Sequence, residues 1–329
     1  MLRAIGIDLG TCKSVMAVLR RGEPQVIPNH EGSPLTPSAL ALGPSGDLLV
    51  GQAAWAQALA DPRRAVLSFK PRIGLPPALP FNGLEYTGAE LAALLLSGLK
   101  GEAEAALGEP VGRAVLTIPV SFGERQAAAL RWAARLAGLF VLRLAHDPIA
   151  AALAYSLAHP AGEGRTLLVY DLGGGCFSTA VLQRLGGAIT ALGMAGESRL
   201  GGDDLTEQVA AYLRQRVPGE WATFLAQSPP ALQALRLAAE QAKAALSHVE
   251  YTKVSLPRRA QEGLPAIDEL LTRGQLEELI EPCLEETLAL NEHVLAAARL
   301  AREDVGEVLL VGGSTQIPLL RALLAAQLP

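Results

Sequence analysis

The string Gly6-Ile7-Asp8-Leu9-Gly10-Thr11 near the N-terminus is matched by Tyr170-Asp171-Leu172-Gly173-Gly174-Gly175, and Asp171 stands 163 residues after Asp8. In both strings an apolar run leads into Asp-Leu-Gly and small residues, and a second apolar run follows. This pattern predicts two β-hairpins whose glycine turns expose backbone N–H groups, which together form an anion-binding concavity. A carboxylate beside such a turn repels phosphate unless a cation lies between them, and Mg²⁺ is commonly held by one or two carboxylates with phosphates and water. The repeat therefore predicts two facing half-sites that share a phosphate chain and Mg²⁺.

The composition limits the classes of function that need considering. The chain has 329 residues, of which 50% are hydrophobic, so it is large enough for about two domains. The net charge of −5 and the lack of long basic runs argue against nucleic acid as a partner. The apolar runs are too short to cross a bilayer, and the N-terminus does not resemble a secretory signal. Three cysteines do not form a disulfide framework, so we expect a cytoplasmic protein. Because its apolar runs are short, we also expect no membrane partner.

Both halves of the chain begin with strand, turn, strand and strand, and then alternate helices with strands. Short apolar strands between helices favour buried sheets that are covered on both faces. The repeat predicts two such lobes with a ligand in the cleft between them. Strands are expected at 4–8, 14–19, 23–28, 111–119, 140–144, 166–171, 177–182, 187–193, 252–256 and 307–311, with one short strand region within 38–108. Helices are expected at 52–60, 87–107, 123–136, 149–157, 205–217, 231–248, 274–300 (either continuous or broken at Pro282) and 317–328.

Seven strings, in order along nearly the whole chain, resemble the nucleotide-binding domain of the Hsp70 (DnaK-type) chaperones, within the actin, sugar kinase and Hsp70 ATPase superfamily. They lie at residues 5–11, 49–52, 117–120, 147–155, 169–175, 200–203 and 309–315. The resemblance implies an α/β fold with two duplicated ribonuclease H-like (actin-like ATPase) lobes. Each lobe would have an inner and an outer subdomain, and the nucleotide would lie in the cleft between the lobes.

The resemblance also implies the boundaries of the subdomains. Lobe I would consist of an inner subdomain at 1–37 and 109–165 and an outer subdomain at 38–108. Lobe II would consist of an inner subdomain at 166–203 and 288–329 and an outer subdomain at 204–287. We expect the inner subdomain of lobe II to be short at its C-terminal end, and the family's substrate-binding domain to be absent from these 329 residues.

Roles for individual residues follow from the same resemblance. Asp8 and Asp171 would hold Mg²⁺ through water, and Lys70 would be the catalytic lysine that offsets charge on the γ-phosphate of ATP. Lys70, Asp147, Asp171, Asp8 and Thr11 together form the expected catalytic set.

The resemblance places the remaining nucleotide contacts in five short segments. They are the first turn (Gly10, Thr11, Cys12, Lys13), the second turn (Gly173, Gly174, Gly175, Cys176), the loop Gly201, Gly202 and Asp203, the adenosine positions Glu240, Lys243 and Ser247 on one helical face, and Gly312, Gly313, Ser314 and Gln316 beneath the nucleoside.

Several positions depart from the family pattern. Cys12 and Cys176 stand where the family has Thr, Ser178 where it has Asp, and Asp147 where it has Glu. Lys13 stands where the family usually has Asn or Tyr, and Gln316 replaces a usual Arg. A thiol is a weaker hydrogen-bond donor than a hydroxyl, and the carboxylates that would position and deprotonate water are fewer and shorter. We therefore expect tight binding of ATP or ADP with slow or absent hydrolysis.

Each of these assignments has a structural alternative. Asp8 and Asp171 could be plain turn residues, and Lys70 a solvated lysine. Asp147 before Pro148 could be a helix N-cap. Glu240 and Lys243 could form an ordinary ion pair on a helix surface, and Gly201-Gly202 could be only a loop before a helix.

The leading hypothesis is an Hsp70-like, chaperone-related ATP-binding ATPase domain in which Mg²⁺-dependent nucleotide binding closes the lobes. A nucleotide-exchange factor or a J-domain-type co-chaperone would then be its protein partner. The alternatives are a hydrolysis-deficient nucleotide-binding regulatory module, a small-molecule kinase of the same superfamily, and a filament-forming protein like actin.

Overall fold

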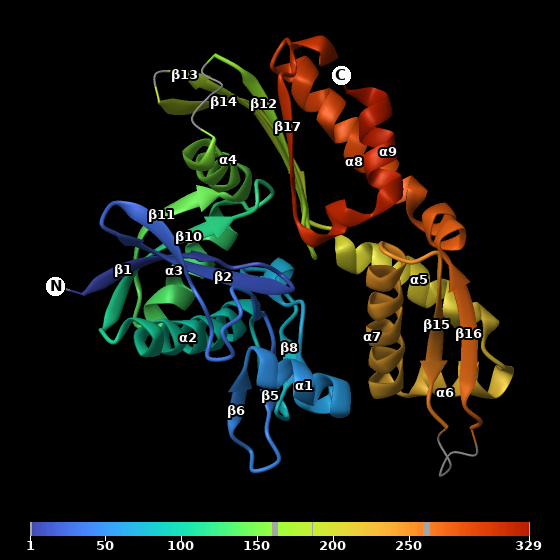
Figure 1. Cartoon of the computed structure of the whole chain (residues 1–329). Helices are drawn as coiled ribbons and strands as arrows, with labels where there is room; N and C mark the ends of the chain where they lie inside the picture. The colour runs from blue at the N-terminus through green and yellow to red at the C-terminus, as the bar shows by residue number, and fades with distance from the viewer. Residues whose placement is uncertain (1, 160–163, 186, 259–263, 329) are drawn as a thin grey trace.

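The chain folds into two lobes around two separate mixed sheets (Figure 1). This computed structural model describes residues 2–159, 164–185, 187–258 and 264–328. Lobe I contains the elements from β1 to α4, and lobe II contains those from β12 to α9. The mixed α/β architecture is the two-lobe arrangement predicted from the sequence.

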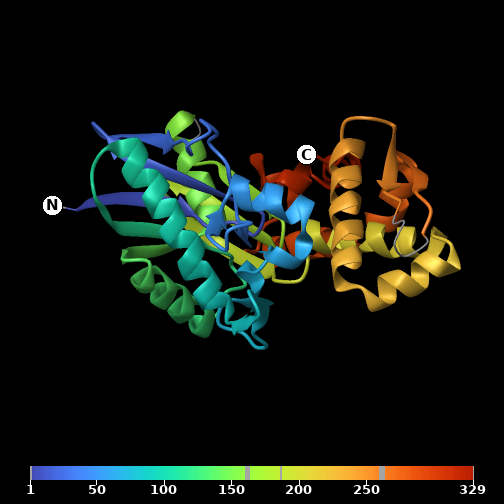
Figure 2. The same ribbon diagram turned by 90° about the horizontal axis from the view of Figure 1, so that it is seen from below.

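The inner sheet of lobe I has the strand order β11-β10-β1-β2-β3, and β4 pairs with β2. Its strands are β1 (Arg3–Asp8), β2 (Lys13–Arg20), β3 (Glu23–Ile27), β4 (Thr36–Pro37), β10 (Val111–Ile118) and β11 (Phe140–His146). Helices α2 (Gly88–Leu107) and α3 (Glu124–Leu136) run side by side along one side of lobe I (Figure 2). Apolar side chains from alternate positions of β1, such as Ile5 and Ile7, are buried in the core that these helices complete.

The inner sheet of lobe II has the order β14-β13-β12-β17. Its strands are β12 (Thr166–Leu172), β13 (Phe177–Leu185), β14 (Ala188–Glu197) and β17 (Glu307–Val311), and the helices α8 (Arg273–Ala297) and α9 (Pro318–Gln327) belong to the same lobe. Helix α4 (Asp147–Ala158) comes from lobe I but packs Ala152 against Val169, Ala180 and Leu182 of the lobe II sheet. This helix therefore fixes part of the contact between the lobes.

The repeat in the sequence is also a repeat in strand register. Gly6 pairs with Ala17 and Asp8 with Val15 in lobe I. In lobe II, Val169 pairs with Ala180 and Asp171 with Ser178. All four positions are shifted by the same 163 residues as the two Asp-Leu-Gly strings. Because register fixes the face to which each side chain points, the two aspartates occupy equivalent places at the ends of equivalent strands.

The remaining elements of each lobe lie outside the two large sheets. In lobe I these are β5 (Leu40–Leu42), β6 (Leu48–Val50), α1 (Gln52–Ala60), η1 (Pro62–Arg64), β7 (Ala65–Val66), η2 (Lys70–Arg72), β8 (Leu79–Phe81) and β9 (Leu84–Tyr86). In lobe II they are α5 (Gly202–Arg216), α6 (Gly219–Gln227), α7 (Pro229–Leu246), β15 (Tyr251–Leu256) and β16 (Ile267–Thr272). The short helices η4 (Arg302–Asp304) and η5 (Gly313–Gln316) flank β17. One strand region is predicted in 38–108, where several short strands occur, and the sequence pattern does not predict α6 or β16.

Two local features show how the sequence sets the helix ends. Thr87 and Glu90 form the predicted capping box at the start of α2. Helix α8 continues through Pro282, so the alternative of a broken helix is wrong; this proline lies on the exposed side of the helix, where the missing N–H costs least.

Among the described residues, no helix combines the length and apolar character needed to cross a bilayer.

Candidate functional site

The two Asp-Leu-Gly turns meet where the lobes join. A Cβ atom added to Gly175 would lie 2.6 Å from the Thr11 Oγ1 atom, and one added to Gly174 would clash with Cys12 Sγ. Only glycine at these two positions allows so close an approach. Within the described part of the chain, the N–H groups of Thr11, Cys12, Gly174 and Gly175 donate to no backbone carbonyl. They are therefore available to bind an anion.

The second turn is supported from behind by the start of α5. The N–H of Gly202 donates to the carbonyl of Gly173 at 2.9 Å, and the N–H of Asp203 donates to that of Gly174 at 2.6 Å. A Cβ atom on Gly201 would lie 2.5 Å from the backbone nitrogen of Cys176. The Gly201-Gly202 segment is thus more than a plain loop before a helix, because it holds the second turn in place.

Lys70 is the buried cation of the site. It lies in η2, and its side chain is only 5% exposed, with Nζ 3.6 Å from Oδ2 of Asp147. Burial acts to lower the pKa of Lys70, but Asp147, assisted by Asp8 and Asp171 among others, raises it to about 12. The lysine is therefore charged at neutral pH, and the alternative of a solvated surface lysine is wrong.

Asp147 is the first residue of α4, and its carboxylate does not cap the helix. His146 occupies the N-cap position and makes no side-chain cap bond. Burial raises the pKa of Asp147 in spite of Lys70, and its Oδ1 atom is buried without a hydrogen-bond partner among the described residues. The N-cap interpretation of Asp147 is therefore wrong, and among the described residues its Oδ1 atom has no group to satisfy it.

Asp8 and Asp171 belong to the same electrostatic cluster. Thr117 Oγ1 donates to Asp8 Oδ1 at 2.6 Å. Burial, followed by the charges of Asp147 and Asp8, raises the pKa of Asp171 to about 7, while Lys70 acts in the opposite direction. The alternative of two independent turn residues does not account for this coupling across the lobes.

The charges of the cluster fit a hydrated divalent cation. Three carboxylates surround one lysine, which leaves excess negative charge and an unpaired buried oxygen on Asp147. Among the described residues, no three His, Cys, Asp or Glu side chains are placed to ligate a metal directly. Asp8 and Asp171 are the carboxylates that could hold Mg²⁺ through its waters, because Mg²⁺ keeps several of them when it binds.

The two cysteines of the turns are thiols at neutral pH. Burial raises the pKa of Cys176 to about 12, and loss of hydration, reinforced by Asp203 and Glu240, raises that of Cys12. Cys12 Sγ donates to Asp203 Oδ1 at 3.7 Å across the lobes. Ser178 is buried, and its Oγ accepts the backbone N–H of Val120 at 3.2 Å. Neither Cys176 nor Ser178 supplies an ionised group to the site.

The residues expected to contact adenosine are tied to the phosphate turns. Lys243 on α7 pairs with Glu240 at 2.7 Å and donates from Nζ to the carbonyl of Gly202 at 2.6 Å. Lys243 is 5% exposed, so the alternative of an ordinary surface ion pair is wrong. Ser247 lies one turn further along and donates to the carbonyl of Lys243 at 3.4 Å.

The segment after β17 passes close beneath the second turn. Gly312 has a φ angle of +89°, and a Cβ atom there would collide with the carbonyl oxygen of Leu172. A Cβ atom on Gly202 would lie 2.7 Å from Ser314 Oγ, while the exposed Gly313 is open to solvent. Gln316 and Ser247 line one cavity. Lys13 pairs with Pro37 through the backbone and has an exposed side chain.

Several residues that hydrogen-bond to this site were not predicted from the sequence. Ser68 of lobe I hydrogen-bonds Asp203 of lobe II, and Thr206 Oγ1 hydrogen-bonds Glu240. Thr117 lies in one of the strings that carry the family resemblance, which is the signal that could have identified it. Ser68 and Thr206 have no local sequence signal, because only the three-dimensional contact shows their role.

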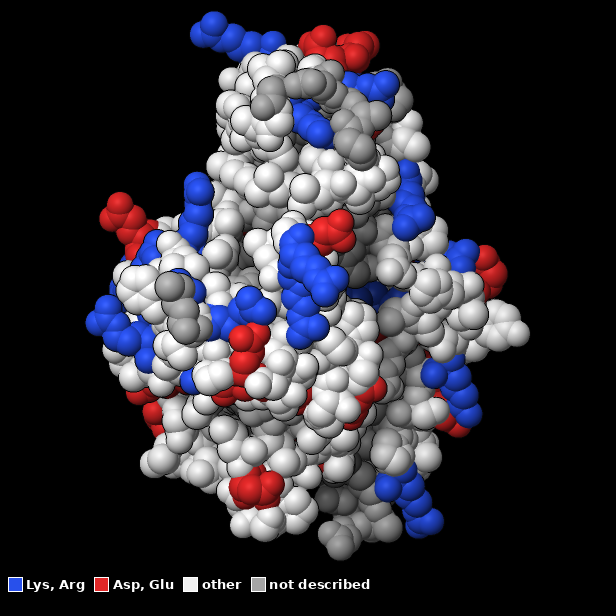
Figure 3. Space-filling view, turned by 60° about the vertical axis from the view of Figure 1, so that its left-hand side comes forward, with Lys and Arg blue, Asp and Glu red and all other residues white. Residues whose placement is uncertain are grey.

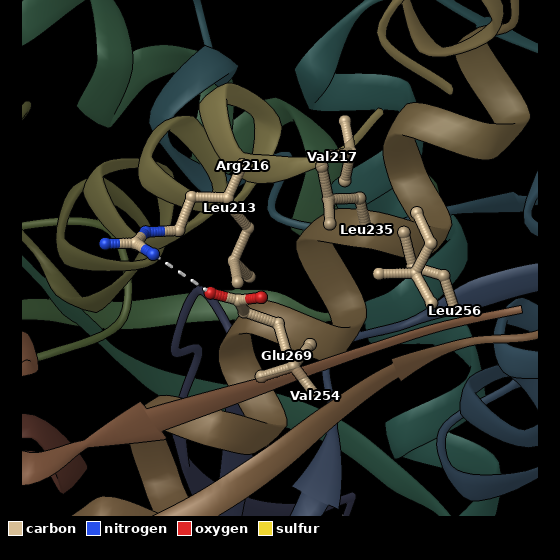
Figure 4. Close-up of a pocket in the computed structure, with 8 residues that line it drawn as sticks. Leu213, Arg216, Val217, Leu235, Val254, Leu256 and Glu269 are labelled. Atoms are coloured by element: carbon tan, nitrogen blue, oxygen red, sulfur yellow. Dashed lines mark hydrogen bonds and ion pairs between the residues drawn. The ribbon is translucent and has the colours of Figure 1, made fainter. Parts of the chain in front are cut away.

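Two other surfaces carry no comparable chemistry. A cavity of about 10 Å³ in lobe II is lined by apolar side chains such as Leu213 and Leu235 and by the ion pair between Arg216 and Glu269 (Figure 4). A cavity this small holds about one water molecule. On the face in Figure 3, acidic and basic side chains are interspersed, and neither sign forms a broad patch.

A two-lobe α/β fold with duplicated Asp-Leu-Gly turns between the lobes defines the class of actin-like ATPase folds. The Hsp70 protein family model matches residues 4–80 and 77–328. The chain therefore belongs to the Hsp70 family, and its 329 residues correspond to an Hsp70-like nucleotide-binding domain.

Proposed function

We propose that this protein binds ATP with Mg²⁺ between its lobes and hydrolyses it slowly, as a chaperone-related ATPase domain. The observation that carries the proposal is the clustering of Asp8, Asp147 and Asp171 around the buried Lys70. The free N–H groups of the two glycine turns lie in the same place as this cluster. Few structural roles need three carboxylates and a lysine beside an anion-binding turn, since burying such charges costs free energy unless a ligand compensates them.

The roles of the residues follow from their positions. The N–H groups of the turns bind the phosphates, and Asp8 and Asp171 hold the waters of Mg²⁺. When bound, Mg²⁺ neutralises part of the charge on the phosphate oxygens. Lys70 stabilises the charge that develops on the γ-phosphate. Asp147 Oδ1, which is buried and has no partner among the described residues, accepts a hydrogen bond from the attacking water and orients it.

Slow hydrolysis follows from two residues of lobe II. Cys176 presents a protonated thiol, which is a weak hydrogen-bond donor to phosphate or water. Ser178 cannot act as a base at neutral pH, and its oxygen is already bonded to the N–H of Val120. Of the three described carboxylates that act on Lys70, Asp147 is then the one that does not also hold the metal.

Closure of the lobes is the proposed output of nucleotide binding. Asp203 of lobe II contacts Ser68 and Cys12 of lobe I, so contacts across the cleft respond directly to what lies between the turns. Hinge closure around a ligand is a common route from binding to a signal. A nucleotide-exchange factor or a J-domain-type co-chaperone would read this change in a cytoplasmic stress response.

A single-turnover assay with Mg·ATP tests the proposal. We expect ATP to bind and ADP to form slowly, and we expect Lys70→Met to abolish the hydrolysis that remains. A rate equal to that of ordinary Hsp70 ATPase domains would contradict the part of the proposal that concerns slow turnover. Binding of ATP with no turnover, and no effect of Lys70→Met, would instead identify a nucleotide-binding regulatory module.

A further inference from the structure

A cavity of about 450 Å³ opens beside the nucleotide site, between the end of α7 and the start of α9. Its lining is formed by Ser247, His248, Gln316, Pro318 and Arg321. The volume is in the range of pockets that hold small ligands. Ser247 lies four residues beyond Lys243, or about 6 Å along the helix, and Lys243 contacts Gly202 beside the second turn. A ligand with its phosphates at the turns can therefore place its other end in this cavity.

The chemistry of the lining suits a flat, uncharged ring. The described lining residues supply a hydroxyl, an amide, an imidazole and a proline ring, and none of them is a carboxylate. Ser247 and His248, which directly follow α7, are uncharged or weakly basic, and they line one side of the cavity. Among the described residues that line the cavity, Arg321 on α9 is the one with a permanently charged side chain.

Arg321 is held in position for stacking. Its Nε donates to the carbonyl of Thr315 at 3.1 Å, which fixes the guanidinium plane at one end. Among the described residues, its other two nitrogens have no hydrogen-bond partner. A planar guanidinium with free donors stacks on aromatic rings, which a lysine ammonium does less well.

We propose that Arg321 is the residue that stacks on the nucleobase, with Pro318 lining the same pocket and His248 and Gln316 at the ring edge. This inference rests on the proposed function, because it assigns a base-binding residue to the same nucleotide site. If Arg321 stacks on the base, the affinity for ATP depends on the guanidinium of this α9 residue. The phosphate contacts at the turns do not depend on that side chain.

The test compares Arg321→Met with wild type by isothermal titration calorimetry, using Mg·ATP and Mg·tripolyphosphate, which has no base. Arg321→Met should weaken Mg·ATP binding by about fivefold to tenfold and leave Mg·tripolyphosphate binding unchanged. Arg321→Lys should also weaken Mg·ATP binding, because it keeps the charge but loses the plane. Arg214→Met, which removes an exposed arginine of α5, is the matched control and should bind both ligands as wild type does.

The outcomes separate this inference from the proposed function. Unchanged Mg·ATP affinity in Arg321→Met, or an equal loss for both ligands, would overturn the stacking role. Wild-type protein that binds neither ligand would overturn the proposed function itself. Arg321→Lys keeps the inference testable if Arg321→Met fails to fold, since wild-type affinity for Mg·ATP in that variant would also overturn it.

Discussion

Replacing Asp171 by Asn should stabilise the protein without ligand while it abolishes tight binding of Mg·ATP. The reason is that burial and the charges of Asp147 and Asp8 raise the pKa of Asp171 from 3.8 to about 7. The unfolded chain releases this proton near pH 4 and the folded protein only near pH 7. The folded state therefore binds more protons in this window, and the wild type loses stability as the pH rises through it.

The size of the effect follows from the pKa shift. The pKa of Asp171 differs by about three units between the folded and unfolded states. This difference lowers the free energy of unfolding of the wild type by about 4 kcal/mol between pH 4 and pH 8. Asn carries no charge, so its stability has no such dependence at this position. The free energy of unfolding of Asp171→Asn minus that of wild type should thus grow by about 2–4 kcal/mol between pH 4 and pH 8.

Urea unfolding of the two proteins at a series of pH values, without nucleotide, measures this difference. Asp268→Asn is a useful control, because Asp268 is an exposed carboxylate whose pKa is lowered by Lys253 and Ser255, so its contribution should have the opposite sign. If the difference in the free energy of unfolding between Asp171→Asn and wild type stays constant from pH 4 to pH 8, burial and the neighbouring carboxylates do not raise the pKa of Asp171, and the prediction is refuted.

Three further predictions concern other parts of the site. Lys70→Met should abolish turnover and lower the free energy of unfolding by about 3 kcal/mol at pH 7, because it leaves Asp147 buried without its cation; single-turnover kinetics and urea unfolding check both effects, and unaltered stability would contradict the ion pair. The double variant Cys176→Thr with Ser178→Asp should raise the single-turnover rate about tenfold or more, and an unchanged rate would show that these residues do not limit hydrolysis. Gly312→Ala should cost about 2–4 kcal/mol, since it adds strain at a φ of +89° and a clash with Leu172; thermal melting compares it with Gly313→Ala, where the added Cβ meets no atom.

Much of the inner architecture could be predicted because it follows from short-range patterns. The two Asp-Leu-Gly strings share one order of apolar and small residues, and the strands on either side pair in the register that this order requires. Capping by Thr87 and Glu90 likewise depends on residues three positions apart. The short strands outside the two large sheets could not be predicted one by one. Strands of two or three residues, such as β5 and β7, have too few side chains to show an alternating apolar pattern.

The site was predicted only in part for a similar reason. Lys70 and Asp147 could be named from the family pattern, but the 3.6 Å distance between their charged groups depends on the three-dimensional placement of two segments that are far apart in the sequence. The N-cap interpretation of Asp147 was reasonable from the sequence alone, and it is wrong because the buried lysine attracts the carboxylate away from the helix end. Helix α6 had a detectable signal, since Trp221 and Leu225 are four residues apart and both are buried.

The central claim is that Asp8 and Asp171 act together on one Mg²⁺-bound nucleotide between the lobes. The most direct test is thermal melting of wild type and of the Asp8→Asn, Asp171→Asn double variant, with ATP at about 100 times its dissociation constant and either Mg²⁺ or EDTA. We expect Mg·ATP to raise the melting temperature of the wild type by about 5 °C, and most of this shift to vanish with EDTA or in the double variant. Equal protection of both proteins, with or without Mg²⁺, would contradict the claim.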